Sequence, residues 1–477
     1  MQATKDNRLG TENITRLMIS LAIPSVLAQI VNVLYNIVDR IYIGRIPGVG
    51  AVALTGVGVT FPIITIISAF SGFASGGGAP LAAIALGQGD RKRAERILGN
   101  CVSMLLFFTV ILMAFFFVFQ KPLLYVFGAS DNTIGYSSTY ISIYLLGTVF
   151  VELAVGLNTF ISAQGQARTA MFSDQYGEHG GPGQARTAMF SVLIGAVVNI
   201  VLDPIFIFVF HMGVAGAAVA TIISQALSAA WVLRFLCSEK SGIRLKKAGM
   251  KPDFSLIGQI MALGVSPFVM SATESAITIV MNHGLQVYGG DLYVGSMTIL
   301  QSVLQLVFVP ISGFTNGVQP IISYNFGAGK FDRVKMTIKR MISITFLAAF
   351  VYVVFAMLRP GLFARLFTTD EDLIALVKKV LPVYIAGMSV FGVQSGVQSS
   401  FLGLGQAKIS LCIALLRKVI LLIPLALILP RFFGVMGVYY AEPVADILSV
   451  LTASTLFLLN IRKILSKEML AKVTHTT

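Results

Sequence analysis

The chain has 477 residues, of which 56% are hydrophobic and 12% are charged, and its mean hydropathy is +0.83. These values exclude a soluble protein and are typical of a polytopic membrane protein. The net charge of +14 would suit nucleic-acid binding if it formed one stripe, but the basic residues are spread over short segments. We therefore expect no nucleic-acid partner, and the lipid bilayer is the expected surroundings.

Twelve apolar runs are each long enough to cross a bilayer, which takes roughly 20 helical residues. The first run is too long for a signal peptide and carries Asp39, so we expect it to remain in the membrane. The sequence predicts an all-α polytopic membrane protein with transmembrane helices at residues 17–43, 51–79, 97–119, 137–163, 188–210, 213–237, 255–284, 292–322, 336–358, 374–404, 409–429 and 435–460.

An even number of spans places both termini on the same side of the membrane. Of the 35 lysines and arginines, 27 fall to the termini and the loops that precede odd-numbered helices, and 8 to the opposite face. Because loops that stay in the cytoplasm are enriched in Lys and Arg, we expect both termini to be cytoplasmic, in a multi-pass protein of the inner (cytoplasmic) membrane.

The two halves of the chain share motifs at an offset of 240 residues. Gly77-Gly78-Ala79-Pro80 aligns with Gly317-Val318-Gln319-Pro320, and Gly165-Gln166-Ala167-Arg168 aligns with Gly405-Gln406-Ala407-Lys408. Six helices separate equivalent elements, so the sequence predicts two pseudo-symmetric six-helix lobes of parallel topology, with a substrate path between them. The predicted divisions are an N-terminal segment 1–16, an N-lobe 17–237, a basic cytoplasmic linker 238–254, a C-lobe 255–460 and a cytoplasmic tail 461–477.

An 18-residue duplication interrupts this register within residues 165–191. The run GQARTAMFS occurs at Gly165–Ser173 and again at Gly183–Ser191, and beyond it the offset between the lobes falls to 221. We interpret the duplication as an insertion in the first lobe rather than a functional module, and no role is assigned to the spacer residues Glu178 and His179.

Six acidic residues fall inside predicted spans, where a charge is costly and therefore suggests a function. They are Asp39, Glu152, Asp203, Glu274, Glu442 and Asp446. Asn199 and Asp203 are four residues apart and share one helix face, although a structural pair that links helices would show the same spacing. Asp39 and Thr221 are expected at a similar depth, so the four side chains predict an all-oxygen site for H⁺ or Na⁺.

The second lobe does not repeat this site. Asn199 and Asp203 align near Ile420 and Pro424, while Thr221 aligns near Glu442 and Asp39 near Asn282. Ion binding is therefore expected mainly in the first lobe. A possible substrate cleft is expected to include Glu274, Gln394, Gln398, Glu152 and Glu442, although glutamines also hold membrane helices together by hydrogen bonds.

Several of these motifs resemble those of multidrug and toxic compound extrusion (MATE) transporters of the DinF/MepA-like branch. They are Ala22-Ile23-Pro24, Asn36 to Gly44, the loops Gly87-Gln88-Gly89-Asp90 and Gly165-Gln166-Ala167-Arg168, and Asn199-Ile-Val-Leu-Asp203-Pro204. The resemblance covers about residues 10–460 apart from the duplication. It implies cation-coupled drug export by two six-helix lobes, a cation site at Asp39, Asn199, Asp203 and Thr221, and a hinge at Pro24. Glu274 lies in the helix that carries a functional Glu in another branch of the family.

The sequence thus predicts a monomeric antiporter, not an enzyme, that exports amphipathic, often cationic, organic compounds in exchange for H⁺ or Na⁺. No cofactor is expected, and no metal beyond Na⁺ at the coupling site. A lipid-linked precursor flippase is the closest alternative, and it would need several basic residues inside its cleft to hold pyrophosphate. A membrane-embedded enzyme would need a nucleophile and base or a metal cluster, which the sequence does not display.

Overall fold

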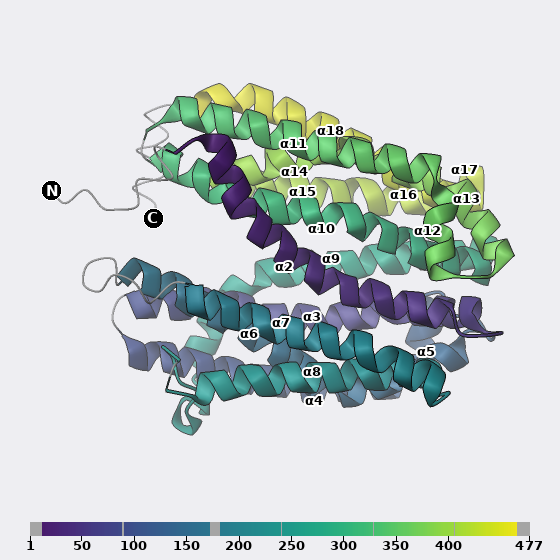
Figure 1. Cartoon of the computed structure of the whole chain (residues 1–477), viewed down its shortest axis with the longest axis horizontal. Coiled ribbons are helices and arrows are strands. Elements are labelled where there is room, and N and C mark those ends of the chain that lie inside the picture. Colours follow the sequence, from purple (N-terminus) through teal and green to yellow (C-terminus); the bar gives the residue numbers. More distant parts are fainter. Residues whose placement is uncertain are drawn as a thin grey trace. The chain divides into compact units, whose positions relative to one another are not determined.

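The computed structural model describes residues 12–87, 90–171, 182–239, 241–327, 329–404 and 406–464. Over these ranges the regular structure is helical throughout, as predicted (Figure 1). The first half contains α2 (Ile14–Gly44), α3 (Gly50–Gly87), α4 (Arg91–Val126), α5 (Ile134–Leu146), α6 (Thr148–Met171), α7 (Pro182–Pro204), the π-helix η1 (Ile205–Val209), α8 (Val214–Cys237) and the 3₁₀ turn η2 (Lys247–Met250).

The second half contains long helices and several short helical segments. They are α9 (Phe254–Gly289), α10 (Asp291–Gly327), α11 (Phe331–Leu358), α12 (Pro360–Phe367), α13 (Glu371–Ile385), α14 (Met388–Gly403), α15 (Ala407–Leu415), the π-helix η3 (Leu416–Leu422), α16 (Ile423–Ile428), α17 (Pro430–Phe433) and α18 (Val435–Ile464). Across the described residues, eight helices are long and apolar enough to span a membrane, or eleven when each bent pair counts as one span. The apolar segment Ile14–Ile23 of α2 belongs to the remaining predicted span.

Three predicted spans are bent rather than straight, and one of them is the predicted helix 255–284, which bends by 49° between Phe254–Val265 and Pro267–Gly289. The predicted helix 137–163 bends by 60° between α5 and α6, and the predicted helix 374–404 bends by 41° between α13 and α14. Glycines 147 and 387 lie at these last two breaks, 240 residues apart. Hydropathy alone predicts continuous runs here because the side chains on both sides of each break are apolar.

The contacts at these two breaks follow the repeat that the sequence predicts. A methyl group added to Gly147 would meet Ile222 of α8, and one added to Gly387 would meet Pro443 of α18, which lies 221 residues further along than Ile222. Gly156 in α6 and Gly396 in α14 are again 240 residues apart, and Gly156 packs closely against Leu105 of α4 and Ser71 of α3, while Gly396 packs closely against α11. Both lobes therefore use the same helix contacts, and this supports their pseudo-symmetry.

The chain forms two compact units. The N-unit is Leu34–His283, and the C-unit joins Met1–Val33 to Gly284–Thr477. The first part of α2 thus belongs to the C-unit and most of α9 to the N-unit. Small residues allow the close contacts involved: Gly317 of α10 lies against the backbone of Ala22, and Gly77 of α3 lies against the backbone of α9 at Ile260 and Gly264. These boundaries differ from the predicted lobes 17–237 and 255–460, and the lobe boundaries stay a prediction.

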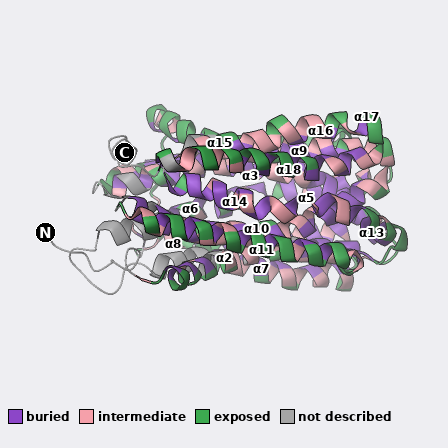
Figure 2. Ribbon diagram, turned by 90° about the horizontal axis from the view of Figure 1, so that it is seen from above, coloured by how far each residue is buried: buried purple, intermediate pink, exposed green. Residues whose placement is uncertain are grey.

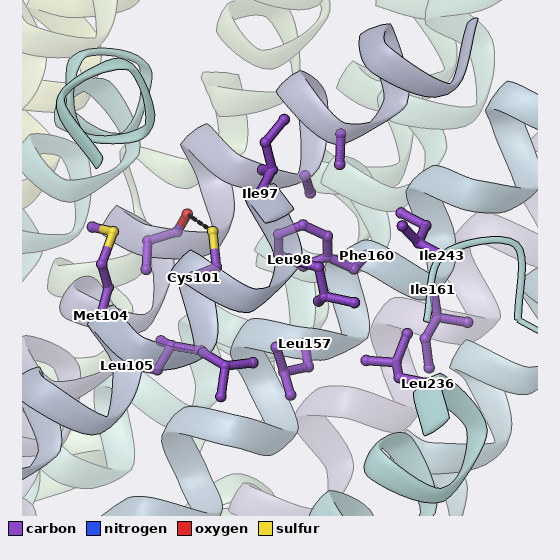
Figure 3. Packing of buried hydrophobic residues seen from close by; sticks show 14 of the residues in the cluster. Ile97, Leu98, Cys101, Met104, Leu105, Leu157, Phe160, Ile161, Leu236 and Ile243 are labelled. Atoms are coloured by element: carbon purple, nitrogen blue, oxygen red, sulfur yellow. Dashed lines mark hydrogen bonds between the residues drawn. The ribbon is translucent and has the colours of Figure 1, made fainter. Parts of the chain in front are cut away.

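The core of the N-unit is an apolar cluster contributed by α3, α4, α6 and α8 (Figure 3). Leu98, Cys101 and Leu105 of α4 pack against Leu157 and Phe160 of α6. Cys101 lies inside this core with its Sγ atom 3.5 Å from the carbonyl oxygen of Ala74. Exposed residues run along many of the helices (Figure 2). Large apolar side chains such as Phe107, Val110 and Leu458 are among them, as expected of surfaces that face lipid.

Candidate cation site

Asn199 and Asp203 form a buried polar pair on α7. The helix is apolar around them, so their side chains share a face because they are one turn apart. Asn199 donates a hydrogen bond from Nδ2 to Oδ1 of Asp203 at 3.0 Å, and Asp203 is fully buried. Pro204 ends α7 and the wider π-helix η1 follows it. Since proline has no N–H, it also leaves one carbonyl of the preceding turn without its usual helical donor.

Thr221 joins this pair from the next helix. A tight turn with Gly213 at φ 55° lets α8 return along α7, and Gly216 allows α8 to approach the backbone of Phe206 closely. Asn199 Nδ2 then lies 3.4 Å from Oγ1 of Thr221, which is buried. The structure therefore brings together three of the four side chains predicted for the cation site by direct contacts.

Asp39, the fourth predicted residue, is buried in α2 and interacts electrostatically with Asp203. Arg40 follows it in the chain, is also buried, and lies with its Cζ atom 5.0 Å from the centre of the Phe61 ring. The four predicted residues therefore belong to one site within the N-unit. A local positive charge comes from Arg40, which was not among the residues predicted from the sequence.

Tyr140 is a further member of this site that the sequence did not reveal. It is buried in α5, its hydroxyl is hydrogen-bonded to Thr221, and it interacts electrostatically with both Asp39 and Asp203. One of several tyrosines near the start of a predicted span carries no distinguishing sequence signal. Only the packing of α5 against α8 identifies it.

Three buried oxygen atoms of the site have no hydrogen-bond partner. They are Oδ1 of Asp39, Oδ1 of Asn199 and Oδ2 of Asp203. A buried polar atom without a partner is costly, and a carboxylate more so. A proton on one carboxyl group, or a hard monovalent cation among these oxygens, would remove that cost. The arrangement thus has the chemistry of a proton or Na⁺ site.

The C-unit carries a different polar cluster at the equivalent helices. Arg417 of η3 donates hydrogen bonds to Asp446 Oδ1 at 2.6 Å and to Glu442 Oε1 at 2.8 Å, and its Cζ atom lies 5.3 Å from the Phe391 ring centre. Glu442 and Asp446 are buried and one turn apart on α18. Glu442 and Asp446 are therefore already paired with a cation, namely the guanidinium group of Arg417.

Arg417 corrects one prediction made from the sequence. The count of basic loop residues included Arg417 and Lys418, but both lie in η3 inside the eleventh predicted span. The sequence does contain a signal for this contact, because an arginine within the apolar run 409–429 needs a buried acidic partner. Ile420, which aligns with Asn199, is 60% exposed. The second lobe therefore does not place a polar group there.

The other predicted residues are divided between the two units. Glu152 is fully buried in α6, and neither of its carboxylate oxygens has a hydrogen-bond partner. Glu274 is exposed and belongs to the N-unit, while Gln394 and Gln398 lie on α14 of the C-unit. The substrate cleft that these residues would form stays a prediction.

Two further predictions concern parts of the chain that the structure covers incompletely. Pro24 falls within α2, but its side chain lies outside the described residues. The duplication is described only in part, since α6 ends at Met171, α7 begins at Pro182, and residues 172–181 between them lie outside the described residues. Within the described ranges, no group of three or more His, Cys, Asp or Glu side chains has the arrangement of a metal site.

Comparison with known proteins gives consistent matches along the chain. The model of the MatE family matches residues 24–173 and 267–428. The multidrug export protein MepA of Staphylococcus haemolyticus (strain JCSC1435) is 24% identical over 434 residues, which is 91% of each chain. MepA of Staphylococcus aureus (strain MSSA476) is 25% identical over 437 residues, or 91% of this chain and 92% of that one.

Two solved structures extend the match to the fold. The MATE multidrug transporter DinF-BH, solved in complex with a dye, is 32% identical, with a TM-score of 0.73 over 98% of this chain and 99% of that chain. An inward-facing multidrug resistance MATE family transporter has a TM-score of 0.81 at 21% identity, over 94% of this chain and 99% of that chain. These neighbours have twelve helices in two lobes, which confirms the predicted fold class. On the family match and on the similarity to DinF-BH, this membrane protein belongs to the MATE family of transporters.

Proposed function

We propose that the protein is a cation-coupled antiporter that exports amphipathic, often cationic, organic compounds across the cytoplasmic membrane in exchange for H⁺ or Na⁺. The observation that carries this proposal is the buried group of Asp39, Asn199, Asp203 and Thr221, in which three oxygens have no partner. Buried oxygens without a partner are costly in a purely structural group of side chains. A site that exchanges an ion needs them.

Coupling follows from a difference in ion affinity between two conformations. A proton or Na⁺ that binds one of them more tightly shifts the population towards it, whereas equal affinity would shift nothing. Two nearby carboxylates such as Asp39 and Asp203 titrate as a pair, so occupancy of one changes the charge that the other meets. Asn199 of α7 donates a hydrogen bond to Asp203, and the same amide nitrogen lies close to the Thr221 hydroxyl of α8. A change of charge at Asp203 therefore acts on the contact between these two helices.

The proposed substrate class is based on the relatives and on what their names say they transport or bind. The curated relatives are named multidrug export proteins, and DinF-BH was solved in complex with a dye. We extend this activity to the present chain because the similarity covers 91% of it for the MepA relatives and 98% for DinF-BH. The many Met and Phe residues, 18 and 34 in number, suit an adaptable apolar cavity for compounds of varied shape.

A lipid-linked precursor flippase is less well supported. Such a protein needs buried basic side chains that are available to bind pyrophosphate. Arg417 donates to two carboxylates, and Arg40 lies next to Asp39 and over Phe61. An enzyme is also less well supported, since the family is one of transporters and the described residues contain no metal cluster.

The proposed orientation places both termini in the cytoplasm, following the bias of basic residues towards that side. The proposed working form is a monomer in the bilayer. No cofactor is required, since the coupling ion supplies the driving force.

Efflux from proteoliposomes tests the proposal. The purified protein is reconstituted, a fluorescent organic cation is loaded, and pH and Na⁺ gradients are imposed separately. We expect one of the two gradients to drive efflux and the other to have little effect. Efflux that ignores both gradients would exclude coupled antiport, and flipping of a fluorescent lipid-linked pyrophosphate instead would favour the flippase.

A further inference from the structure

Glu152 is a buried acid in the interior of the N-unit. It lies near the start of α6, its side chain is fully buried, and neither oxygen of its carboxyl group has a hydrogen-bond partner among the described residues. None of the ion pairs found within those residues includes it. The adjacent Leu153 and Ala154 belong to the apolar core of the unit. An ionised carboxylate without a partner is very unfavourable in such surroundings, so the group takes up a proton instead.

The packing of α4 against α6 places one polar side chain opposite Glu152. The two helices belong to consecutive spans, so they run antiparallel. Gly156 of α6 lies against Leu105 of α4. One turn further along α4 is Thr109, and one turn back along α6 is Glu152. Since side chains four residues apart share a helix face, Thr109 and Glu152 face one another at the next level of this contact.

A second contact supports this register. A methyl group added to Gly78 of α3 would meet both Cys101 of α4 and Phe160 of α6. Cys101 lies one turn before Leu105, and Phe160 lies one turn after Gly156. Two contacts one turn apart therefore establish both the direction and the offset of the two helices.

The Thr109 hydroxyl is available to Glu152. Thr109 is buried, and its hydroxyl oxygen has no hydrogen-bond partner in the described parts of the chain. Other helical threonines, such as Thr55 and Thr139, donate to the carbonyl oxygen four residues earlier. Ser71 of α3 lies nearby and donates to the backbone carbonyl of Glu152 at 3.4 Å. A carboxyl group and one free hydroxyl offer too few oxygens for a hard metal cation, but they suffice for a proton.

The second lobe builds the same helix contact without polar side chains. At the offset of 240 residues, Glu152 aligns with Gly392 of α14 and Thr109 aligns with Ala349 of α11. Ala349 is fully buried, and Gly392 lies directly against the backbone of Thr345, one turn before Ala349. This contact therefore does not require an acid, and packing alone does not explain a carboxyl group buried at position 152.

We propose that Glu152 is a second proton-binding site of the N-unit, in which its carboxyl group is protonated at neutral pH and faces the hydroxyl of Thr109. A carboxylic acid both donates and accepts hydrogen bonds, and so does a hydroxyl, so the two groups are complementary. The site is distinct from the candidate cation site, because Glu152 and Thr109 lie between α6 and α4, whereas Asn199 and Thr221 join α7 to α8. It does not depend on the proposed antiport.

Solid-state ¹³C NMR of the full-length protein in lipid vesicles tests the proposal. The protein is prepared with ¹³C at the δ-carboxyl carbon of its glutamates, because this carbon resonates upfield in a protonated acid relative to an ionised carboxylate. We expect the parent to show a protonated-glutamate resonance at neutral pH that stays in place as the pH becomes moderately alkaline. Glu152→Gln should remove this resonance and still fold, since the amide has the size of the neutral acid.

Glu239 provides the matched control, since its side chain is 91% exposed and pairs with Arg244. Glu239→Gln should remove a resonance at the ionised position. Thr109→Val keeps the shape of the side chain without its hydroxyl, and it should shift the Glu152 resonance while the acid stays protonated. The proposal would be overturned by a parent spectrum in which every glutamate is ionised at neutral pH, by a protonated resonance that persists in Glu152→Gln, or by an unmoved resonance in Thr109→Val.

Discussion

Asn199 donates a hydrogen bond to Asp203 one turn along α7, and the same amide nitrogen lies 3.4 Å from the Thr221 hydroxyl of α8. One amide group thus holds a carboxylate and a hydroxyl in place while its own oxygen stays without a partner. This leaves the oxygens of Asn199 and Asp203 available to a bound ion. It also makes the geometry of the site depend on the packing of α7 against α8.

Asp203→Asn should abolish gradient-driven efflux while the protein still folds and inserts. Asparagine has nearly the same size but cannot gain or lose charge, so the site no longer distinguishes ion-bound from ion-free states. Efflux from proteoliposomes measures the effect, and Asp372→Asn on the exposed face of α13 is the matched control. Near-parental efflux in Asp203→Asn would move the coupling site elsewhere, with Glu274 and Glu442 as the next candidates.

Arg417→Gln should destabilise the protein strongly. It leaves the buried carboxylates of Glu442 and Asp446 without their shared cation, and breaking a buried ion pair in this way typically costs about 3–5 kcal/mol. The midpoint of thermal unfolding in detergent provides the measurement. Neutralising all three side chains together (R417Q/E442Q/D446N) should restore much of the loss, and a triple variant as unstable as Arg417→Gln would contradict this explanation.

The two glycines at the helix breaks should differ in their tolerance of alanine. A methyl group at Gly387 would lie 2.6 Å from the Cα atom of Pro443, which belongs to the backbone and cannot move easily. At Gly147 it would meet the side chain of Ile222, which has more freedom. We expect Gly387→Ala to lower stability by about 1–3 kcal/mol and Gly147→Ala to lower it by less.

Gly72 in α3 is the matched control for these two substitutions. Nothing lies within 4 Å of the position that its methyl group would take. Gly72→Ala should therefore keep or raise the unfolding temperature, because alanine favours a helix over glycine by about 0.5–1 kcal/mol. A loss as large as that of Gly387→Ala would show that close packing is not the cause.

A C-terminal reporter that is active only in the cytoplasm should be active when fused to this protein. The expectation follows from the excess of lysine and arginine on one side of the predicted topology, which remains after Arg417 and Lys418 are assigned to the membrane. A reporter that works only in the periplasm serves as the control. Activity of that second fusion would reverse the proposed direction of transport.

Deletion of residues 165–182 should preserve folding and efflux. The second lobe makes the same connection without an equivalent of these 18 residues, and the deletion brings the later offset of the repeat from 221 to 239, one short of the 240 found before the duplication. Reconstituted efflux and yield from the membrane should both match the parent. A deletion variant that inserts normally but does not transport would give the duplication a functional role.

The sequence by itself predicted the twelve apolar spans, the repeat and the pairing of Asn199 with Asp203. Each depends on local geometry: bilayer thickness sets the length of a span, and the pitch of an α-helix places residues i and i+4 on one face. The positions of the glycine breaks could also be located by the repeat, since Gly147 and Gly387 are 240 residues apart. The bends at those positions could not be read from hydropathy.

Only the tertiary structure decided which side chains from different helices meet. Tyr140 joins Thr221 because α5 packs on α8, and Arg417 reaches Glu442 and Asp446 because η3 packs on α18. No spacing along the chain encodes these contacts, since two helices can face one another at many rotations and offsets. The choice among them comes from the fit of side chains over the whole interface, and small residues such as Gly216 and Gly387 set how closely the helices approach.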